Sequence, residues 1–162
     1  MIRAELARAT IATPEDMKRF GVGLAKLLRA SDLLVLTGPL GAGKTALTQG
    51  IGAGLGVTSA VTSPTFVIAR NHRREAGEPD LVHVDAYRLG SPFELDDLDI
   101  DFENSIVVVE WGQGFFDPAE QPLLEIVIER DETGESEVRK VTANGFGQRW
   151  AETSWPVESW LK

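Results

Sequence analysis

The sequence predicts an α/β fold of three layers, in which helices cover a mixed sheet that has a parallel core and antiparallel hairpins. In the front part of the chain, a short, fully apolar run lies between two segments with helical spacing, which is typical of strands alternating with helices. In the middle and the rear, apolar runs flank polar turns that contain glycine, which favours β-hairpins. The 162 residues contain no repeat and no linker rich in Pro, Gly or Ser, so we expect a single domain over residues 1–162.

The front part begins with a helix that we expect directly after Thr13. Threonine is a favoured N-cap, and Pro14 suits the first helical position. The apolar run at residues 33–36 predicts a buried strand. Residues 44–55 predict a second helix, because their large apolar side chains are four residues apart.

The middle of the chain predicts a hairpin and a short helix. Residues 61–68 and 81–84 have the composition of strands, and the polar segment 71–80 lies between them. Residues 91–98 predict a helix, because they begin with the Ser-Pro-x-Glu pattern of a capped N-terminus.

The rear part predicts one more buried strand and a second hairpin. The buried strand is expected at residues 106–109, and the hairpin pairs residues 123–128 with 138–143 around a turn at 132–134. Three tryptophans then follow at a spacing of five, which makes no single helical face. We expect them to fasten the tail to the core rather than to stack on nucleic-acid bases: Trp150, Trp155 and Trp160.

Composition excludes several classes of function. The 16 basic and 25 acidic residues give a net charge of −9, which counts against a module that binds nucleic acid by broad phosphate neutralisation. The absence of cysteine excludes disulfides, thiolate catalysis, iron–sulfur clusters and the common zinc sites. The first twelve residues contain no apolar signal segment, and no run is long enough to span a bilayer. We therefore expect a soluble, cytoplasmic protein with no membrane contact.

One motif carries a specific chemistry. It fits the phosphate-binding P-loop pattern G-x-x-x-x-G-K-[ST] and lies between the predicted strand and helix: Gly38-Pro39-Leu40-Gly41-Ala42-Gly43-Lys44-Thr45. The glycines let successive N–H groups point at phosphate oxygens, and the helix adds its positive N-terminus. Lys44 supplies a charge to the phosphates, and the Thr45 hydroxyl is a ligand for Mg²⁺. The alternative is an ordinary glycine-rich turn, which the strand–loop–helix context disfavours.

Nucleotide hydrolysis also requires an acidic group near the metal and a positioned water. Two acids end apolar strands, where parallel strands place groups close to a P-loop: Asp85 and Glu110. Each alone is compatible with a solvated strand end, but the pair beside a P-loop favours a shared site. The predicted catalytic residues are therefore Lys44, Asp85 and Glu110.

Four motifs in this order resemble the TsaE (YjeE) family of bacterial P-loop ATPases. They are the P-loop, Ser63-Pro64-Thr65-Phe66, His83-x-Asp85-x-Tyr87-Arg88 and Val109-Glu110-Trp111. The resemblance extends over residues 13–145 and implies a P-loop NTPase-like fold. It also implies Mg²⁺-dependent ATP hydrolysis that supports threonylcarbamoyl transfer to adenosine 37 of tRNAs. The implied partners are TsaB and TsaD subunits, and contact with tRNA would be only indirect, through that complex.

The resemblance also implies roles for individual residues. Thr45 and Glu110 would hold Mg²⁺, and Asp85 would act at the metal or at the attacking water. Thr65 would lie in a switch-like segment near the γ-phosphate, and Trp111 beside the nucleotide at the surface that meets the partners. The complete set expected to bind nucleotide is Thr13, Gly38, Pro39, Leu40, Gly41, Ala42, Gly43, Lys44, Thr45, Ala46, Thr65, Trp111 and Arg139.

Four other features have competing interpretations. The basic cluster at residues 70–74 is more often a solvated hairpin tip than an RNA contact. Arg88 either stabilises transition-state charge or pairs with the acidic run 94–103. That run imitates the start of a calcium loop but lacks its glycine and its bidentate glutamate, so we expect a solvated acidic face. His83 is expected to be a hydrogen-bonded sheet histidine rather than a catalytic base.

Three functions remain open from the residues alone. The chain is an ATPase within a tRNA-modifying complex, a small P-loop kinase, or a nucleotide-binding module without turnover. A kinase usually has an arginine-bearing lid, for which the sequence offers only hairpins. A pure binding module does not require two acids at strand ends. The N-K-x-D motif of guanine specificity is missing, which favours ATP over GTP.

Overall fold

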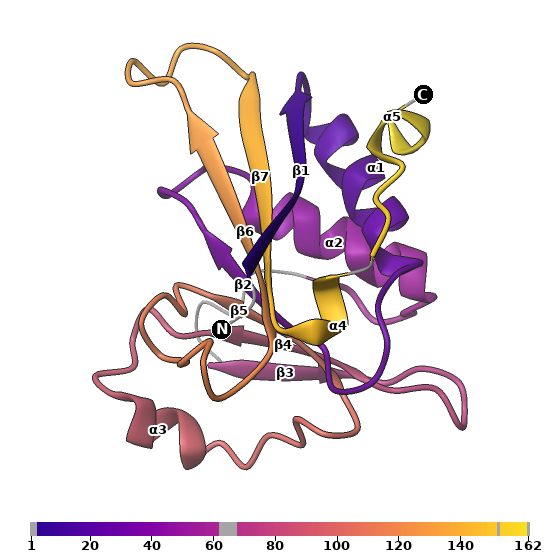
Figure 1. Cartoon of the computed structure of the whole chain (residues 1–162), viewed down its shortest axis with the longest axis vertical. Helices are drawn as coiled ribbons and strands as arrows, with labels where there is room; N and C mark the ends of the chain where they lie inside the picture. Colours follow the sequence, from indigo (N-terminus) through magenta and orange to yellow (C-terminus); the bar gives the residue numbers. More distant parts are fainter. Residues whose placement is uncertain (1–2, 62–67, 152, 162) are drawn as a thin grey trace.

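The computed structural model describes residues 3–61, 68–151 and 153–161. In this part of the chain, helices cover a seven-stranded sheet of order β1-β7-β6-β2-β5-β4-β3 (Figure 1). The strands are β1 (Arg3–Ile11), β2 (Leu33–Thr37), β3 (Ala69–His72), β4 (Leu81–Asp85), β5 (Ile106–Glu110), β6 (Leu123–Arg130) and β7 (Arg139–Phe146). The helices are α1 (Pro14–Ala25), α2 (Lys44–Leu55), α3 (Pro92–Asp96), α4 (Gln148–Ala151) and α5 (Val157–Trp160).

The sheet is parallel in its centre and antiparallel at both edges. Strand β2 pairs in parallel with β5 on one side and β6 on the other, and β4 continues the parallel part beside β5. The antiparallel pairs are β6 with β7, β7 with β1, and β3 with β4. This arrangement confirms the predicted α/β fold with a mixed sheet.

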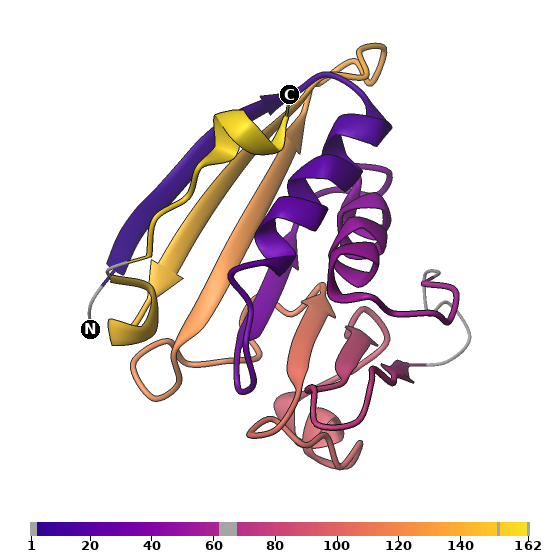
Figure 2. The same ribbon diagram turned by 90° about the vertical axis from the view of Figure 1, so that its right-hand side faces the viewer.

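The two faces of the sheet are covered differently. Helices α1 and α2 lie side by side on one face (Figure 2), over a core that includes Phe20, Leu24, Leu47 and Ile51. A Cβ atom on Gly50 would lie 2.2 Å from a backbone oxygen of α1, so only glycine permits this close approach of the two helices. The other face is covered by the short helix α3 and by loop segments, so this outer layer is thin.

The first helix and the tail follow the sequence-based predictions. The Thr13 hydroxyl accepts a hydrogen bond from the Asp16 amide (3.1 Å), which caps α1. Trp150 is buried in the core, and the Trp160 ring packs edge-on against Phe20 at 5.4 Å between centroids. The tryptophans therefore fasten the tail to the core, as predicted.

Parts of the structure differ from the sequence-based expectations. The structure has a nine-residue strand at the N-terminus, β1, which the sequence analysis did not anticipate. Its alanine, leucine, glutamate and arginine residues favour helix locally, but pairing with β7 along its length outweighs that preference. At the start of α3, Ser91 makes no side-chain cap; instead, Glu94 accepts a hydrogen bond from the Gly90 amide.

The described strand that pairs with β4, β3, follows the residues 61–68 predicted for it. Val61 and Ile68 are outside any strand, residues 62–67 lie outside the described part of the chain, and β3 covers Ala69–His72. The polar residues of β3 are in a strand because they pair with β4, His72 opposite Leu81. His72 is buried, and its Nδ1 atom is 2.7 Å from the Ser59 hydroxyl.

Candidate nucleotide-binding site

The P-loop connects the end of β2 to the start of α2. Gly41 and Gly43 have φ angles of +77° and +117°, which residues with a side chain rarely adopt. Gly43 is the N-cap of α2 and offers no side-chain acceptor to the first N–H groups of the helix. These N–H groups therefore remain available for an anion.

Lys44 folds back over the loop. Its Nζ atom donates hydrogen bonds to the carbonyl oxygens of Gly38 (2.6 Å) and Pro39 (2.9 Å), and it lies 4.1 Å from the centre of the Trp111 ring. Burial removes water from the ammonium and lowers its pKa, while the nearby charges of Glu110 and Asp85 partly oppose that effect. The cation is thus held at the place where a phosphate group would need it.

The two predicted acids lie beside the loop. Asp85 and Glu110 end the adjacent parallel strands β4 and β5 and are direct register partners. A cavity of about 530 Å³, within the usual size of a ligand pocket, brings these acids together with most of the P-loop. It is lined by Leu40, Gly41, Ala42, Gly43, Lys44, Thr45, Asp85, Tyr87, Arg88, Glu110 and Trp111.

Both acids are held by hydrogen bonds. Glu110, which is only 5% exposed, is joined through its Oε2 atom to Nε2 of His83 at 2.6 Å. Asp85 accepts a hydrogen bond from the Tyr87 amide (3.0 Å). His83 is fully buried in β4, so its environment agrees with the prediction of a hydrogen-bonded sheet histidine.

The donor set fits a magnesium ion that arrives with a nucleotide. Among the described residues, no group of three or more His, Cys, Asp or Glu side chains is arranged to hold a metal alone. Mg²⁺ in nucleotide sites typically takes only one or two protein ligands and completes its shell with phosphate oxygens and water. The Thr45 hydroxyl and the Glu110 carboxylate, which line the same cavity, would provide that pair.

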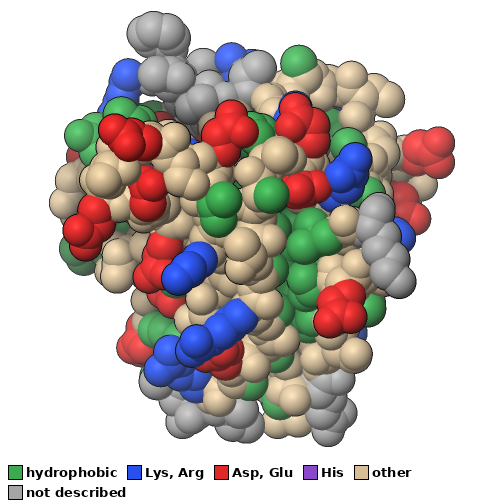
Figure 3. Space-filling model, turned by 90° about the horizontal axis from the view of Figure 1, so that it is seen from above, with side chains coloured by type: hydrophobic (Ala, Val, Ile, Leu, Met, Phe, Trp, Pro, Cys, Tyr) green, Lys and Arg blue, Asp and Glu red, His purple; other side chains and the backbone are tan. Residues whose placement is uncertain are grey.

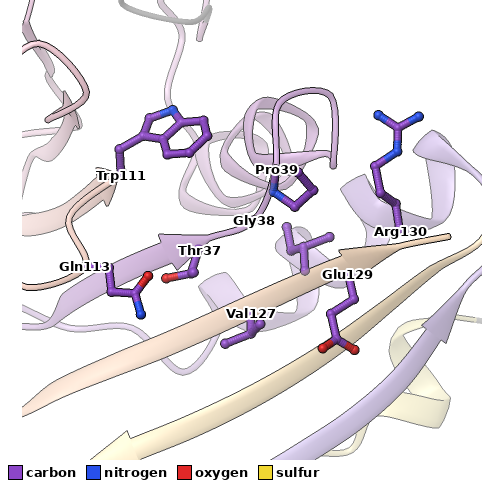
Figure 4. A pocket seen from close by; sticks show the side chains of 9 residues that line it. Thr37, Gly38, Pro39, Trp111, Gln113, Val127, Glu129 and Arg130 are labelled. Carbon is purple, nitrogen blue, oxygen red and sulfur yellow. The ribbon is translucent and has the colours of Figure 1, made fainter. Parts of the chain in front are cut away.

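Trp111 separates this cavity from a second one. The second cavity, about 600 Å³, is also lined by Thr37, Gly38, Pro39 and residues of β6. Figure 4 shows the Trp111 indole above the end of β2, on the same side as Pro39. The indole contacts Tyr87 at 5.3 Å between ring centroids, and the Trp111 backbone has an unusual φ angle of +61°.

Several residues predicted to bind nucleotide do not line the P-loop cavity. Gly38 and Pro39 line the second cavity, and Thr65 lies outside the described residues. Thr13 and Ala46 do not line the P-loop cavity: the Thr13 hydroxyl caps α1, and Ala46 packs against the core.

Two arginines support the loop from outside. Arg139 Nε donates to the carbonyl oxygen of Ala42 (3.1 Å), so its contact is with the loop backbone. Arg130 Nη1 donates to that of Leu40 (3.1 Å), a role that the sequence analysis missed. Nothing near Arg130 in the sequence signals it, because the two residues are 90 positions apart.

The basic segment 70–74 is part of the hairpin structure. Arg74 donates to the carbonyl oxygens of Leu55 (2.9 Å) and Pro79 (3.1 Å).

On the face shown in Figure 3, acidic and basic side chains of the described residues are intermixed. No helix among the described residues is long and apolar enough to cross a membrane.

Comparison with known proteins then identifies the family. Residues 11–141 match the family described as "Threonylcarbamoyl adenosine biosynthesis protein TsaE". The chain belongs to the TsaE family. A TsaE protein of Streptomyces coelicolor, a tRNA threonylcarbamoyladenosine biosynthesis protein, is 54% identical over 83% of this chain and 94% of its own length. The TsaE protein of Bacillus subtilis is 36% identical over 85% of this chain and 84% of its own length.

A solved structure has the same fold. The crystal structure of Bacillus subtilis YdiB superposes with a TM-score of 0.70 at 31% identity, covering 93% of this chain and 91% of that one. The matched span in the TsaE family comparison includes the P-loop, both strand-end acids and Trp111. The family's role is in tRNA threonylcarbamoyladenosine biosynthesis.

Proposed function

We propose that this chain is a Mg²⁺-dependent ATPase that supports threonylcarbamoyl transfer to adenosine 37 of tRNAs. The observation that carries the proposal is the single cavity that joins the P-loop to the strand-end acids Asp85 and Glu110. A nucleotide-binding module without turnover would not need the acids, and a kinase would need a second substrate pocket with a lid.

The roles of the residues follow from their chemistry. The P-loop N–H groups and Lys44 would bind the phosphates, and Lys44 would exchange its two carbonyl partners for phosphate oxygens. Thr45 and Glu110 would hold Mg²⁺, and the ion would neutralise part of the negative charge of the phosphates. Asp85, at the end of the neighbouring strand, would orient the attacking water.

Partners are part of the proposal. We propose that TsaB- and TsaD-type subunits cover the nucleotide site in the cytoplasm and that tRNA contacts only the assembled complex. Leu40 and Tyr87 line the cavity and are 84% and 71% exposed, which leaves large apolar groups at its mouth. Aromatic side chains such as that of Tyr87 are enriched at protein interfaces, which supports a partner at this mouth.

ATP hydrolysis by the purified chain, with and without the partner subunits, tests the function. Lys44→Ala should abolish turnover or weaken nucleotide binding at least about tenfold, because the phosphates lose their nearest cation. Lys18→Ala, which removes an exposed lysine from α1, is the matched control and should behave as the wild type. Unchanged affinity and turnover in Lys44→Ala would refute the site, and phosphorylation of a small metabolite would favour a kinase.

A further inference from the structure

The contact between His83 and Glu110 is built into the sheet. His83 is the register partner of Val108, so Glu110, two residues further along β5, lies diagonally across from it. His83 alternates with residues that belong to the core on the α3 side, which places its ring on the face of α1 and α2. The ring is fully buried, and Nε2 is 2.6 Å from Glu110 Oε2.

The direction of this hydrogen bond follows from its partners. In the form that binds a metal, the Glu110 carboxylate is ionised and only accepts hydrogen bonds, which places the hydrogen of this contact on Nε2 of His83. The other ring nitrogen, Nδ1, is buried and has no hydrogen-bond partner among the described residues. With the hydrogen on Nε2 alone, Nδ1 is a buried acceptor without a partner, and a second hydrogen on Nδ1 would make it a buried donor without a partner and charge the ring.

The bond restricts what Glu110 can do. With Oε2 engaged by His83, the second carboxylate oxygen is left for the cavity that Glu110 shares with Thr45. Lys44 lies in the same cavity, yet the described residues include no ion pair between it and Glu110. A glutamate free to rotate would approach this ammonium, and the two charges would neutralise each other where phosphate and metal are needed.

We propose that His83 is a positioning residue, which holds Glu110 by one oxygen so that the other faces the Mg²⁺–nucleotide complex. This inference rests on the proposed function, because it concerns the metal of that site. Hydrogen-bond partners of metal ligands typically change metal affinity by about 10- to 100-fold when removed. We expect an effect of that size on the metal and little effect on binding of metal-free nucleotide.

A matched pair of variants separates the hydrogen bond from the volume of the ring. His83→Gln places an amide N–H near the position of Nε2, whereas His83→Met has a similar length and no donor. Binding of Mn²⁺ in the presence of ADP, followed by electron paramagnetic resonance, should weaken about 10- to 100-fold in His83→Met and less than about threefold in His83→Gln. Binding of ADP in excess chelator should remain the same in both variants.

A second measurement uses the unmodified chain. Only two histidines occur, so ¹⁵N-histidine spectra are simple to assign with a His72 variant. We expect the His83 signals of a ring with hydrogen on Nε2 only, and we expect them to shift when Mg²⁺ and ADP are added together.

The outcomes are distinct. Equal weakening of Mn²⁺ binding in both variants, no weakening in either, or a His83 ring without hydrogen on Nε2 would overturn the inference. Failure of the wild-type chain to bind Mn²⁺ with ADP would overturn the proposed function and the inference with it. Normal wild-type binding and an unaffected His83→Met variant would overturn the inference alone.

Discussion

Two variants, Trp111→Ala and Trp111→Gly, should separate what the Trp111 side chain contributes to the free energy of unfolding from what its backbone conformation contributes. Both variants lose the contact of the indole with the Lys44 ammonium, worth about 0.5–2 kcal/mol, and the pairing with Tyr87, worth about 0.5–1.5 kcal/mol. Tyr87 is largely exposed, so its share lies at the low end. We expect Trp111→Ala to lower the free energy of unfolding by about 2 kcal/mol.

The two variants should differ because of the φ angle of +61°. A left-handed conformation costs a residue with a side chain about 1–2 kcal/mol, and glycine avoids this cost. Glycine in turn loses about 0.4–1 kcal/mol through the greater freedom of its unfolded chain. The net expectation is that Trp111→Gly is more stable than Trp111→Ala by about 1 kcal/mol, the reverse of the order at an ordinary φ angle.

Urea denaturation of both variants measures this difference, provided that the free energy of unfolding decreases with urea concentration at the same slope in both. In a chain of this length, 1 kcal/mol also corresponds to about 2–4 °C in melting temperature. An alanine variant that is as stable as the glycine variant, or more stable, would refute the reasoning. Since both variants lack the indole, their partner-stimulated ATP turnover should fall to a similar extent, and further than their affinity for ATP.

The other predictions concern the metal acid, a buried ion pair and a buried histidine. Glu110→Gln should retain ATP binding but lower ATP turnover in steady-state assays at least about tenfold, which corresponds to roughly 1.4 kcal/mol in the barrier. Normal turnover in Glu110→Gln together with a large loss of turnover in Asp85→Asn would contradict the choice of Glu110 as the metal ligand. Asp32→Ala should lower the free energy of unfolding, measured by urea denaturation, by about 3 kcal/mol, because Arg149 loses the buried carboxylate that it contacts at 2.9 and 3.0 Å. A decrease of less than about 1 kcal/mol would contradict this prediction. Burial lowers the pKa of His72 in the folded chain, so well above pH 6.5 the ring is neutral in both the folded and the unfolded state. As the pH decreases from 6.5 towards the folded-state pKa, the unfolded chain binds the proton first, and the free energy of unfolding therefore falls. His72→Asn should remove the contribution of His72 to the pH dependence of the free energy of unfolding, which is at most about 1.4 kcal/mol per pH unit. Urea titrations at pH 7.5 and 5 measure this dependence, and an unchanged dependence in the variant would contradict the prediction.

The sequence by itself determined the elements whose signals are local. Thr13 and Pro14 predicted the start of α1, and the bounds of α2 agree with the predicted residues 44–55. The P-loop belongs to this class, because its glycines, lysine and threonine act within eight consecutive residues. The apolar runs that became β2 and β5 were also recognisable, since strands buried on both faces are apolar throughout.

Only the tertiary structure decided the features that join distant segments. Strand β1 exists because it pairs with β7, and β3 begins at Ala69 because that register sets His72 opposite Leu81. The sequence suggested that Asp85 and Glu110 share a site, but the order of the strands makes them register partners. The bond from His83 to Glu110 depends on the same register: moving β4 by one residue would turn the ring to the other face of the sheet. Local patterns thus indicated which groups carry the chemistry, and strand pairing decided which of them meet.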